Sequence, residues 1–541
     1  MDNSELFKHE GSDHHHVKNE TESRSSDFEE GAGGVDATDM YRMGKEQQFR
    51  RIFRVSTMMF FTSMVQSTWE IILIAPIGGI INGGLAGLFW SYIWTFVGFV
   101  FIVLSLAEMA SMAPTSGGQY HWVSEFAPRR QQRFLSYMSG WMATLSWQAG
   151  SAGGSFLIGT LIQGCLTAYK PTYIAERWQG TLFVFAVAAL EGFVNILLVN
   201  WLPWLQTVMI FPHGLGWIAV IGFLVALSPK ASAHDVFLNF TSNGGWEPIG
   251  LSLMVGQITS VYFMILSDSA AHLAEEVKTA SRAVPQAMIW SFFSNMLVGF
   301  FILITFIFCM PDINSILDPT INPSGSALLY VFQKASYWGA IPLLVIILLV
   351  MITGIIDSNA STSRQTFAFA RDGGLPFKRF LAKVTKSPGG TPVPMNSIIV
   401  TCIISCLLSL INIGSSVAFN AIISLQLMAL MATYSISIGC VLWQRTVNGG
   451  AHLPYARWSL GSFGTPVNAI AFVYSIFIFF WTGWPGAADP TLQTFNWSPV
   501  MFGGVLILSL VYYVIYGRTH YKGPVVLVRS GAGVSHSGGS F

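Results

Sequence analysis

Four carboxylates lie inside segments of the chain that are otherwise apolar, namely Glu70, Glu191, Asp268 and Asp357. A charge at the centre of a lipid bilayer costs a few kcal/mol even on the mildest scale, so ionisable residues there generally serve a cation, a proton or an ion pair. Glu70 and Asp268 are the strongest candidates because both stand beside short polar strings. Asp357 opens a run of small polar residues that is equally typical of close helix packing, and Glu191 is equally compatible with a pairing role.

Glu70 and Asp268 are 198 residues apart, which is close to the separation between the starts of the two apolar segments that contain them. The two acids therefore occupy matching positions. Their polar strings run from Gln66 to Glu70 and from Ser267 to Ser269. Side chains of this kind satisfy backbone groups that are freed where a helix is interrupted. We therefore expect both helices to be broken near the middle of the bilayer, where exposed helix ends bind a solute. The alternative is two continuous helices whose acids hydrogen-bond to neighbouring helices.

A histidine in a third apolar segment adds a group that titrates near physiological pH. His213 lies between Pro212 and Gly214, which also suggest a local kink. An imidazole in this position can relay protons, and the alternative is a structural hydrogen-bond donor. The candidates for proton coupling are therefore Glu70, His213 and Asp268.

Aromatic residues near the two acids complete the candidate solute site. Trp69 precedes Glu70, and an aromatic face beside a carboxylate suits an ammonium group. Trp147-Gln148 and Tyr262-Phe263 either face a pocket at mid-bilayer or belong to the packed or lipid-facing surface. The candidate binding residues are Gln66, Ser67, Thr68, Trp69, Glu70, Trp147, Gln148, Tyr262, Phe263, Ser267 and Asp268.

The composition of the whole chain shows what kind of molecule must position these residues. Of 541 residues, 52% are hydrophobic and only 10% are charged, and the net charge is +1. Roughly 25% charged residues is usual for a soluble protein, so a soluble enzyme, a disordered scaffold and a nucleic-acid binder are excluded. The five cysteines all lie in apolar stretches and indicate neither a disulfide framework nor a metal cluster. We expect no cofactor, no metal and no catalytic constellation.

Apolar runs long enough to span a membrane repeat along the chain, since about 20 helical residues cross the hydrocarbon layer. Helices are expected because each span must satisfy its own backbone hydrogen bonds. The sequence thus predicts an all-α integral membrane protein in contact with lipid. We count twelve spans, at 54–81, 85–110, 134–164, 180–199, 204–227, 250–273, 286–309, 326–356, 395–412, 418–443, 465–485 and 499–517.

The segments outside the spans predict the orientation. Residues 1–51 contain 12 acidic and 7 basic residues and few large apolar ones, so we expect a disordered acidic tail. If the N-terminus is cytoplasmic, 24 of the 28 Lys and Arg residues lie on the inner side, which places both termini, including the C-terminal tail 518–541, in the cytoplasm. The sequon at Asn239 then faces outward and is a glycosylation candidate.

Three strings in this chain resemble a known family. They are SLAEMASMAPTSGGQYHWVSEFAP (105–128), SDSAAHLAEEVKTASRAVPQAM (267–288) and SRQTFAFARDGGLPF (363–377). They are similar to the fungal amino acid/choline transporters, which include the GABA permease and choline permease types and belong to the amino acid–polyamine–organocation superfamily. The likeness extends from about residue 51 to residue 518.

This resemblance implies a twelve-helix transporter domain over 52–517. Two five-helix inverted repeats would cover about 52–228 and 249–445, followed by two helices at 465–517, with helices one and six broken. It also implies secondary active transport, usually coupled to protons, and a solute site at Ser67, Thr68, Trp69, Glu70, Ser267 and Asp268. The motifs that end in Gly117-Gly118-Gln119 and Arg371-Asp372-Gly373-Gly374 are expected to shape the inner gate.

Two departures from the family leave the cargo open. The family often carries Gly after the acid of helix one and two positions before the Asp of helix six, where this chain has Ile71 and Leu266. Both side chains narrow the pocket or stiffen the breaks. The expected cargo is a small amine-bearing solute, either an amino acid, GABA, choline or a polyamine, moved across the plasma membrane or the vacuolar membrane. The rival interpretation is a nutrient sensor on the same scaffold that does not transport.

Overall fold

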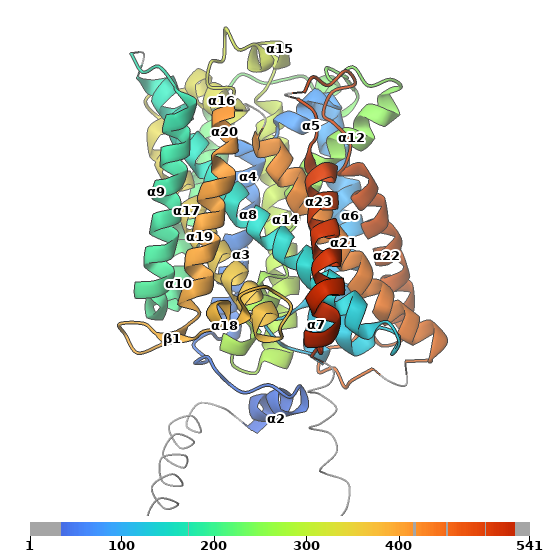
Figure 1. The fold of residues 1–541 in the computed structure, drawn as a ribbon. Coiled ribbons are helices and arrows are strands. Elements are labelled where there is room, and N and C mark those ends of the chain that lie inside the picture. Colours follow the sequence, from blue (N-terminus) through green and yellow to red (C-terminus); the bar gives the residue numbers. More distant parts are fainter. Residues whose placement is uncertain (1–33, 171, 415–417, 451–452, 493, 525–541) are drawn as a thin grey trace, which may run out of the picture.

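The protein is a bundle of long helices, seen in the computed structural model, which describes residues 34–170, 172–414, 418–450, 453–492 and 494–524 (Figure 1). Most helices run between two ends of the bundle. Helix α2 (Gly34–Arg42) and helices α7 (Gln119–Phe126) and α18 (Lys378–Leu381) lie at one, which we call the α2 end. Helices α5 (Ile77–Ile81) and α15 (Ile313–Leu317) lie at the other, the α15 end.

Ten long helices form the body of the bundle. Apolar side chains predominate in all of them, and several turn one face to the interior and another outward. They are α6 (Gly84–Met112), α8 (Gln132–Tyr169), α9 (Arg177–Leu197), α10 (Leu202–Leu227), α14 (Ala280–Phe308), α17 (Ala340–Arg371), α19 (Met395–Ser409), α21 (Ala418–Val447), α22 (Gly464–Trp481) and α23 (Ser498–Tyr512).

Two further helical segments are interrupted at the positions that the polar strings predict. The first consists of α3 (Val55–Gln66) and α4 (Thr68–Ile74), separated by a single residue. The second consists of α12 (Ile249–Tyr262) and α13 (Ser269–His272), separated by residues 263–268.

Short elements connect the long helices. A hairpin of two short strands is the strand structure in the described part of the chain. These elements are α11 (Ala233–Phe237), α16 (Ala327–Ala335), α20 (Ile411–Gly414), α24 (Arg518–His520), the single turns Val199–Trp201, Ala274–Glu276, Gly461–Phe463 and Tyr513–Gly517, and the antiparallel pair β1 (Thr385–Lys386) and β2 (Pro392–Val393).

Nine helices in the described residues are long and apolar enough to cross a membrane. These nine spans contain α6, α9, α10, α14, α17, α19, α21, α22 and α23. Helix α8 spans 38 residues but is rich in Ser and Gly, and α12 belongs to an interrupted pair and is shorter. These lengths and compositions make the chain a multi-pass membrane protein.

The centre of the bundle is built around α8. This helix packs against α7, α9, α17, α19 and α21, while the interrupted segment α3/α4 packs against α14, α17 and α10. Small residues on α8 permit this close approach: a Cβ at Gly140 would collide with Phe369 of α17, and one at Gly159 would lie 2.8 Å from Val184 Cγ2 of α9. The interior is therefore formed where α8, α17 and the two interrupted segments meet.

Two expectations need correction. The predicted span at 326–356 is two helices, because α16 ends at Ala335 and α17 begins at Ala340. Helix α17 then continues through the polar run to Arg371, since Thr362 and Ser363 donate their hydroxyls to carbonyls within the helix, to Ser358 O at 2.8 Å and to Ala360 O at 2.9 Å.

The second correction concerns the N-terminal region. Disorder was expected for 1–51, but residues 34–51 form α2 and an extended segment that crosses the α2 end of the bundle. Asp36 accepts hydrogen bonds from the backbone N–H groups of Thr279 and Ala280 at the start of α14, at 2.8 and 3.0 Å. Residues 1–33 lie outside the described part. We call residues 34–53 the N-terminal strap.

Candidate functional site

The first interruption is a single residue in the left-handed region. Ser67 has φ 37° and ψ 43°, which ends α3 and redirects the chain into α4. Its hydroxyl donates to Met64 O at 2.5 Å, so the side chain satisfies a carbonyl that the helix end leaves free. A short polar side chain suits this conformation, which explains why the break falls within the string Gln66 to Glu70.

The second interruption carries a bulkier residue in a similar conformation. Leu266 has φ 74°, a region that favours glycine and costs other residues about 1–2 kcal/mol. The family resemblance led us to expect Gly at this position, and Leu266 adopts a positive φ that Gly reaches without this cost. Ile71 differs, because it lies inside α4 with ordinary helical geometry.

The two interruptions touch each other at the centre of the bundle. The Thr68 hydroxyl donates to Phe263 O at 3.2 Å, joining the start of α4 to the end of α12. Ser361 of α17 donates to Ser269 O at 3.4 Å, at the start of α13. A side chain at one interruption therefore contacts a backbone carbonyl at the other, 195 residues away in sequence.

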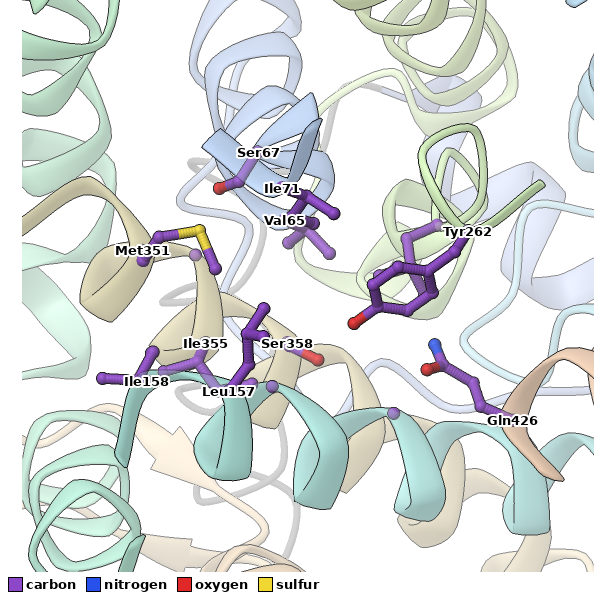
Figure 2. Close-up of a pocket in the computed structure, with 14 residues that line it drawn as sticks. Val65, Ser67, Ile71, Leu157, Ile158, Tyr262, Met351, Ile355, Ser358 and Gln426 are labelled. Carbon is purple, nitrogen blue, oxygen red and sulfur yellow. The ribbon is translucent and has the colours of Figure 1, made fainter. Parts of the chain in front are cut away.

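A small cavity lies beside these interruptions, and we call it the central cavity (Figure 2). Its lining comes from α3 and α4, α8, the end of α12, α17 and α21. The lining residues are Val65, Ser67, Ile71, Gly150, Gly154, Leu157, Ile158, Tyr262, Leu266, Met351, Gly354, Ile355, Ser358 and Gln426.

Among the predicted binding residues, the structure places Ser67 and Tyr262 in this lining. The carboxylates of Glu70 and Asp268 are fully buried but belong to two separate polar clusters outside the lining. The geometry thus separates residues that face the cavity from residues that hold charge or protons behind it.

The Glu70 cluster consists of Trp69, Glu70 and His213. Glu70 Oε1 lies 2.8 Å from His213 Nδ1, and Trp69 Nε1 lies 3.1 Å from the same nitrogen. The indole N–H only donates, so a hydrogen bond from Trp69 requires a lone pair on Nδ1. A hydrogen bond from Nδ1 to Glu70 requires an N–H on the same nitrogen instead. The two contacts therefore call for opposite tautomers of His213.

The Asp268 cluster consists of Gln119, Asp268 and His272. Gln119 Nε2 donates to Asp268 Oδ2 at 2.6 Å, and His272 Nε2 lies 3.8 Å from the same oxygen. His272 Nδ1 contacts Ser116 O at 3.0 Å. The loop that ends in Gly117-Gly118-Gln119 thus reaches into the second interruption as well as lying near the α2 end.

The remaining candidates have packing or bracing contacts. Gln148 donates to Thr366 and Thr401 at 3.0 Å each and so ties α8 to α17 and α19. The Trp147 ring meets the His272 ring edge-on at 4.8 Å. Gln66 accepts from Asn295 at 3.3 Å. Ser267 is buried and lies in the stretch that separates α12 from α13.

The two weaker acidic candidates are hydrogen-bonded within the bundle. Glu191 accepts from Ser155 at 2.6 Å and from Asn359 at 3.1 Å. Asp357 accepts from Gln206 at 2.8 Å. Both are therefore braced by uncharged donors from neighbouring helices, as close packing of α8, α9, α10 and α17 requires.

A network of charged residues closes the α2 end, and we call it the gate network: Lys45, Glu275, Arg371 and Asp372. Arg371 binds Glu275 with two hydrogen bonds of 2.9 and 2.8 Å, and Lys45 of the strap pairs with Asp372. The Lys45 and Asp372 side chains are each 3% exposed. A paired geometry is required at this depth, because a lone buried charge is strongly unfavourable.

The charges of the gate network lower the pKa values of the two acids within it. Burial opposes ionisation of the Asp372 carboxyl, but the charges of Lys45 and Arg371 outweigh it and hold its pKa below the ordinary value. Burial likewise opposes ionisation of Glu275, and Arg371 together with Lys45 holds its pKa below the ordinary value. Both acids are therefore ionised at neutral pH.

Several residues of this region were not predicted from the sequence. Gln426 is an isolated amide in the apolar stretch of α21, and Gly150 and Gly154 have the four-residue spacing typical of close helix contact. Gln119 belongs to a loop motif that was assigned to the gate. These signals are visible in the sequence, but only the packing shows that Gln426 faces the cavity.

Two other expectations concern the surroundings of the site. Asn239 is exposed at the end of α11, with its amide donating to Asp235 Oδ1 at 3.2 Å. Within the described ranges, no group of three His, Cys, Asp or Glu residues is arranged to hold a metal ion.

Comparison with known proteins decides what this bundle is. The amino acid permease family model matches residues 53–507, which includes both interrupted segments and the central cavity. The chain belongs to the amino acid permease family. This confirms the superfamily expected from the three sequence strings and makes the permease a multi-pass membrane transporter rather than an enzyme.

Two relatives and one solved structure illustrate what the chain is similar to. A Macrophomina phaseolina protein named as an amino acid/polyamine transporter is 28% identical over 444 residues, covering 82% of the permease and 96% of that protein. Amino-acid permease 2 of Neurospora crassa is 26% identical over 493 residues, covering 89% of the permease and 88% of its own chain. A solved manganese transporter of Eremococcus coleocola covers 88% of the permease and 94% of its own chain, with 12% identity and a TM-score of 0.49.

Proposed function

We propose that the permease moves a small amine-bearing solute across the membrane by alternating access, coupled to protons. One observation carries this proposal: two interrupted helices contact each other through Thr68 and Phe263, and both border the central cavity. Interrupted helices near the middle of a bilayer offer backbone groups to a polar solute without charged side chains. The family supports the general activity, and this geometry supports the central cavity as the place where it occurs.

The proposed architecture has twelve spans. The nine long apolar helices supply nine of them, α8 supplies a tenth, and the pairs α3/α4 and α12/α13 supply the other two. The inverted repeats then cover about 52–228 and 249–445, with the interrupted helices as the first member of each. We infer that α22 and α23 follow as an additional pair, as the residue order requires.

The proposed orientation places the α2 end in the cytoplasm of a cell whose plasma membrane holds the permease. Residues 34–53 and Tyr521 both lie at this end, where the Tyr521 hydroxyl lies 2.7 Å from Ser136 Oγ, so the two terminal regions share one side. The loops at this end also hold most of the basic residues, as the inner side of a membrane protein does.

Proton coupling is assigned to the Glu70 cluster. His213 Nδ1 faces both Glu70 and Trp69, so the imidazole is within reach of a proton on the Glu70 carboxyl. Trp69 and Glu70 lie on the same short helix, α4, that supplies Ile71 to the cavity. A change in protonation is therefore transmitted to the cavity wall through one rigid turn. Asp268, bonded to Gln119, is the second candidate for this role.

The test is solute flux through the purified permease in liposomes with an imposed pH gradient. We expect accumulation of a labelled amino acid when the outside is acidic and loss of accumulation after a protonophore is added. Flux that is indifferent to both changes contradicts proton coupling while leaving transport in place. Specific binding of amino acids without any flux would instead identify a sensor.

A further inference from the structure

The described lining of the central cavity holds no carboxylate and no basic side chain. Fourteen residues line it, and none of them is Asp, Glu, Lys, Arg or His. The nearest acids belong to the Glu70 and Asp268 clusters, where each already has hydrogen-bond partners. A cargo with a net charge would therefore enter a buried site without a counter-charge, which is strongly unfavourable.

Half of the lining residues have apolar aliphatic or thioether side chains. Leu157 and Ile158 of α8 and Met351 and Ile355 of α17 form one side, and Val65 of α3 extends it. Burial of an apolar side chain against such a surface is favourable in proportion to the area removed from water. Leu266, which occupies the space that glycine would leave open, limits the size of the group that fits.

The opposite side of the cavity is polar but uncharged. Figure 2 shows the Tyr262 hydroxyl and the Gln426 amide on the side away from Met351 and Ile158. Gln426 Oε1 is buried and has no hydrogen-bond partner in the described residues, so it is an acceptor available to a cargo N–H. Uncharged polar groups that share one side of a small cavity suit the amine and the carboxylate of a compact zwitterion.

We propose that the permease carries a neutral α-amino acid with a compact aliphatic side chain. The reason is that the cavity has uncharged polar groups on one side and a wall of Leu, Ile and Met side chains on the other. In this proposal Gln426 sets the preference for uncharged cargo. This inference rests on the proposed function and narrows its cargo. Choline and polyamines, which carry net positive charge, are then poor cargo. GABA is neutral but separates its two charges by three carbons.

The experiment uses the full-length permease in liposomes and labelled L-leucine. Unlabelled L-valine, L-alanine, L-lysine, L-glutamate, GABA, choline and putrescine are added in excess as competitors, and each is also tested as labelled cargo. We expect L-valine and L-alanine to suppress leucine uptake and the charged compounds and GABA to leave it unchanged. Uptake of choline, putrescine, lysine or GABA in preference to leucine overturns the inference, although transport stands. Uptake of none of these compounds contradicts the proposed function itself.

A charge-introducing variant tests the role of Gln426. Gln426→Glu keeps the shape of the side chain and places a carboxylate in the cavity. We expect the ratio of lysine uptake to leucine uptake to rise by about tenfold or more, a gain that a misfolded protein cannot produce. An unchanged ratio in normally inserted protein overturns the assignment of selectivity to Gln426.

Two neighbouring glycines of α8 provide a matched pair of variants for the cavity wall. A Cβ at Gly150 would lie 2.7 Å from Gln426 Nε2, whereas a Cβ at Gly153, outside the lining, would lie 3.4 Å from Ile422 Cγ2. Gly150→Ala should therefore reduce leucine uptake by about tenfold relative to alanine uptake, and Gly153→Ala should leave this ratio unchanged. Equal effects of the two substitutions, or none from Gly150→Ala, would show that the cavity does not select the cargo.

Discussion

At the scale of single residues, the two acids expected to contact the solute lie outside the lining of the central cavity. Glu70 binds His213, and Asp268 binds Gln119, so neither carboxylate borders the central cavity. A buried acid beside an imidazole has a partner for proton exchange, whereas an acid in the cavity would attract only cations. This position agrees with the coupling role that we propose for Glu70 rather than with a contact to the cargo.

Glu70→Gln should separate these roles. The amide cannot release a proton, so we expect pH-driven accumulation to fall by about 100-fold while exchange of labelled for unlabelled cargo at equal pH continues. The measurement is counterflow against gradient-driven uptake in liposomes. Glu191→Gln is the matched control, because Glu191 is an equally buried acid whose partners, Ser155 and Asn359, are uncharged. Full accumulation in Glu70→Gln would refute the coupling role of Glu70.

The residues that could be predicted from the sequence are those with an unusual type for their surroundings. An acid or a histidine in an apolar run is conspicuous, so Glu70, Asp268 and His213 were found, and so were the helix interruptions beside the two acids. Their partners were not found, because a hydrogen bond between Glu70 and His213 joins positions 143 residues apart. Aliphatic wall residues such as Ile355 look the same in sequence whether they face lipid, core or a cavity.

At the scale of elements, the N-terminal strap is the largest difference from the sequence-based expectation. Its composition is typical of disorder, yet Asp36 caps α14 and Lys45 enters the gate network. The strap also adds two bonds to the turn at 274–276, where Ile52 and Phe53 donate to Glu276 O at 3.0 and 3.1 Å. Local composition could not predict this, since the partner of Lys45 lies 327 residues away.

Lys45→Met should loosen the strap. It leaves the buried Asp372 carboxylate without its closest cation, at a cost of about 3 kcal/mol. Because Arg371 and the Tyr120 hydroxyl remain near Asp372, we expect the strap to detach while the bundle stays folded. Amide hydrogen exchange over residues 34–53 reports this directly. Lys278→Met, which removes an exposed lysine close to the strap, is the control and should have no effect.

The strap should be insensitive to mild acid. The pKa values of Asp372 and Glu275 lie below their ordinary values in the folded protein, so their contribution to stability is complete above the ordinary carboxyl pKa of about 4 and is lost only as the pH falls through the lower folded values. Protection of residues 34–53, corrected for intrinsic exchange, should therefore be equal at about pH 7 and about pH 5. A steep loss of protection between these values would show that other groups hold the strap.

At the scale of the whole molecule, the two ends of the bundle have different character. The α2 end is closed by the strap, by four charged residues of the gate network and by Tyr521. The α15 end carries loops with fewer charges and the exposed Asn239. This asymmetry makes the proposed orientation testable.

Expression in a glycosylating host provides that test. Asn239 is exposed just after α11, which packs against α6 through Trp90 donating to Phe237 O at 3.0 Å, so it should carry a glycan and lose it in Asn239→Gln. Another sequon, Asn496-Trp497-Ser498, has its Asn buried, with the amide donating to Thr482 O and Trp484 O at 2.9 and 3.0 Å. Asn496→Gln should therefore leave the mass on a gel unchanged. Absence of any glycan at Asn239 would argue for the opposite orientation.

The N-terminal strap also offers an exposed position from which opening of the α2 end can be followed. Tyr41 is 61% exposed on α2, only four residues before Lys45, whose pair with Asp372 must separate if this end is to open. A fluorescent label on a cysteine placed at Tyr41 would change its surroundings at each such opening. The permease thus carries, in its own N-terminal region, a natural attachment point for an optical reporter of single turnovers.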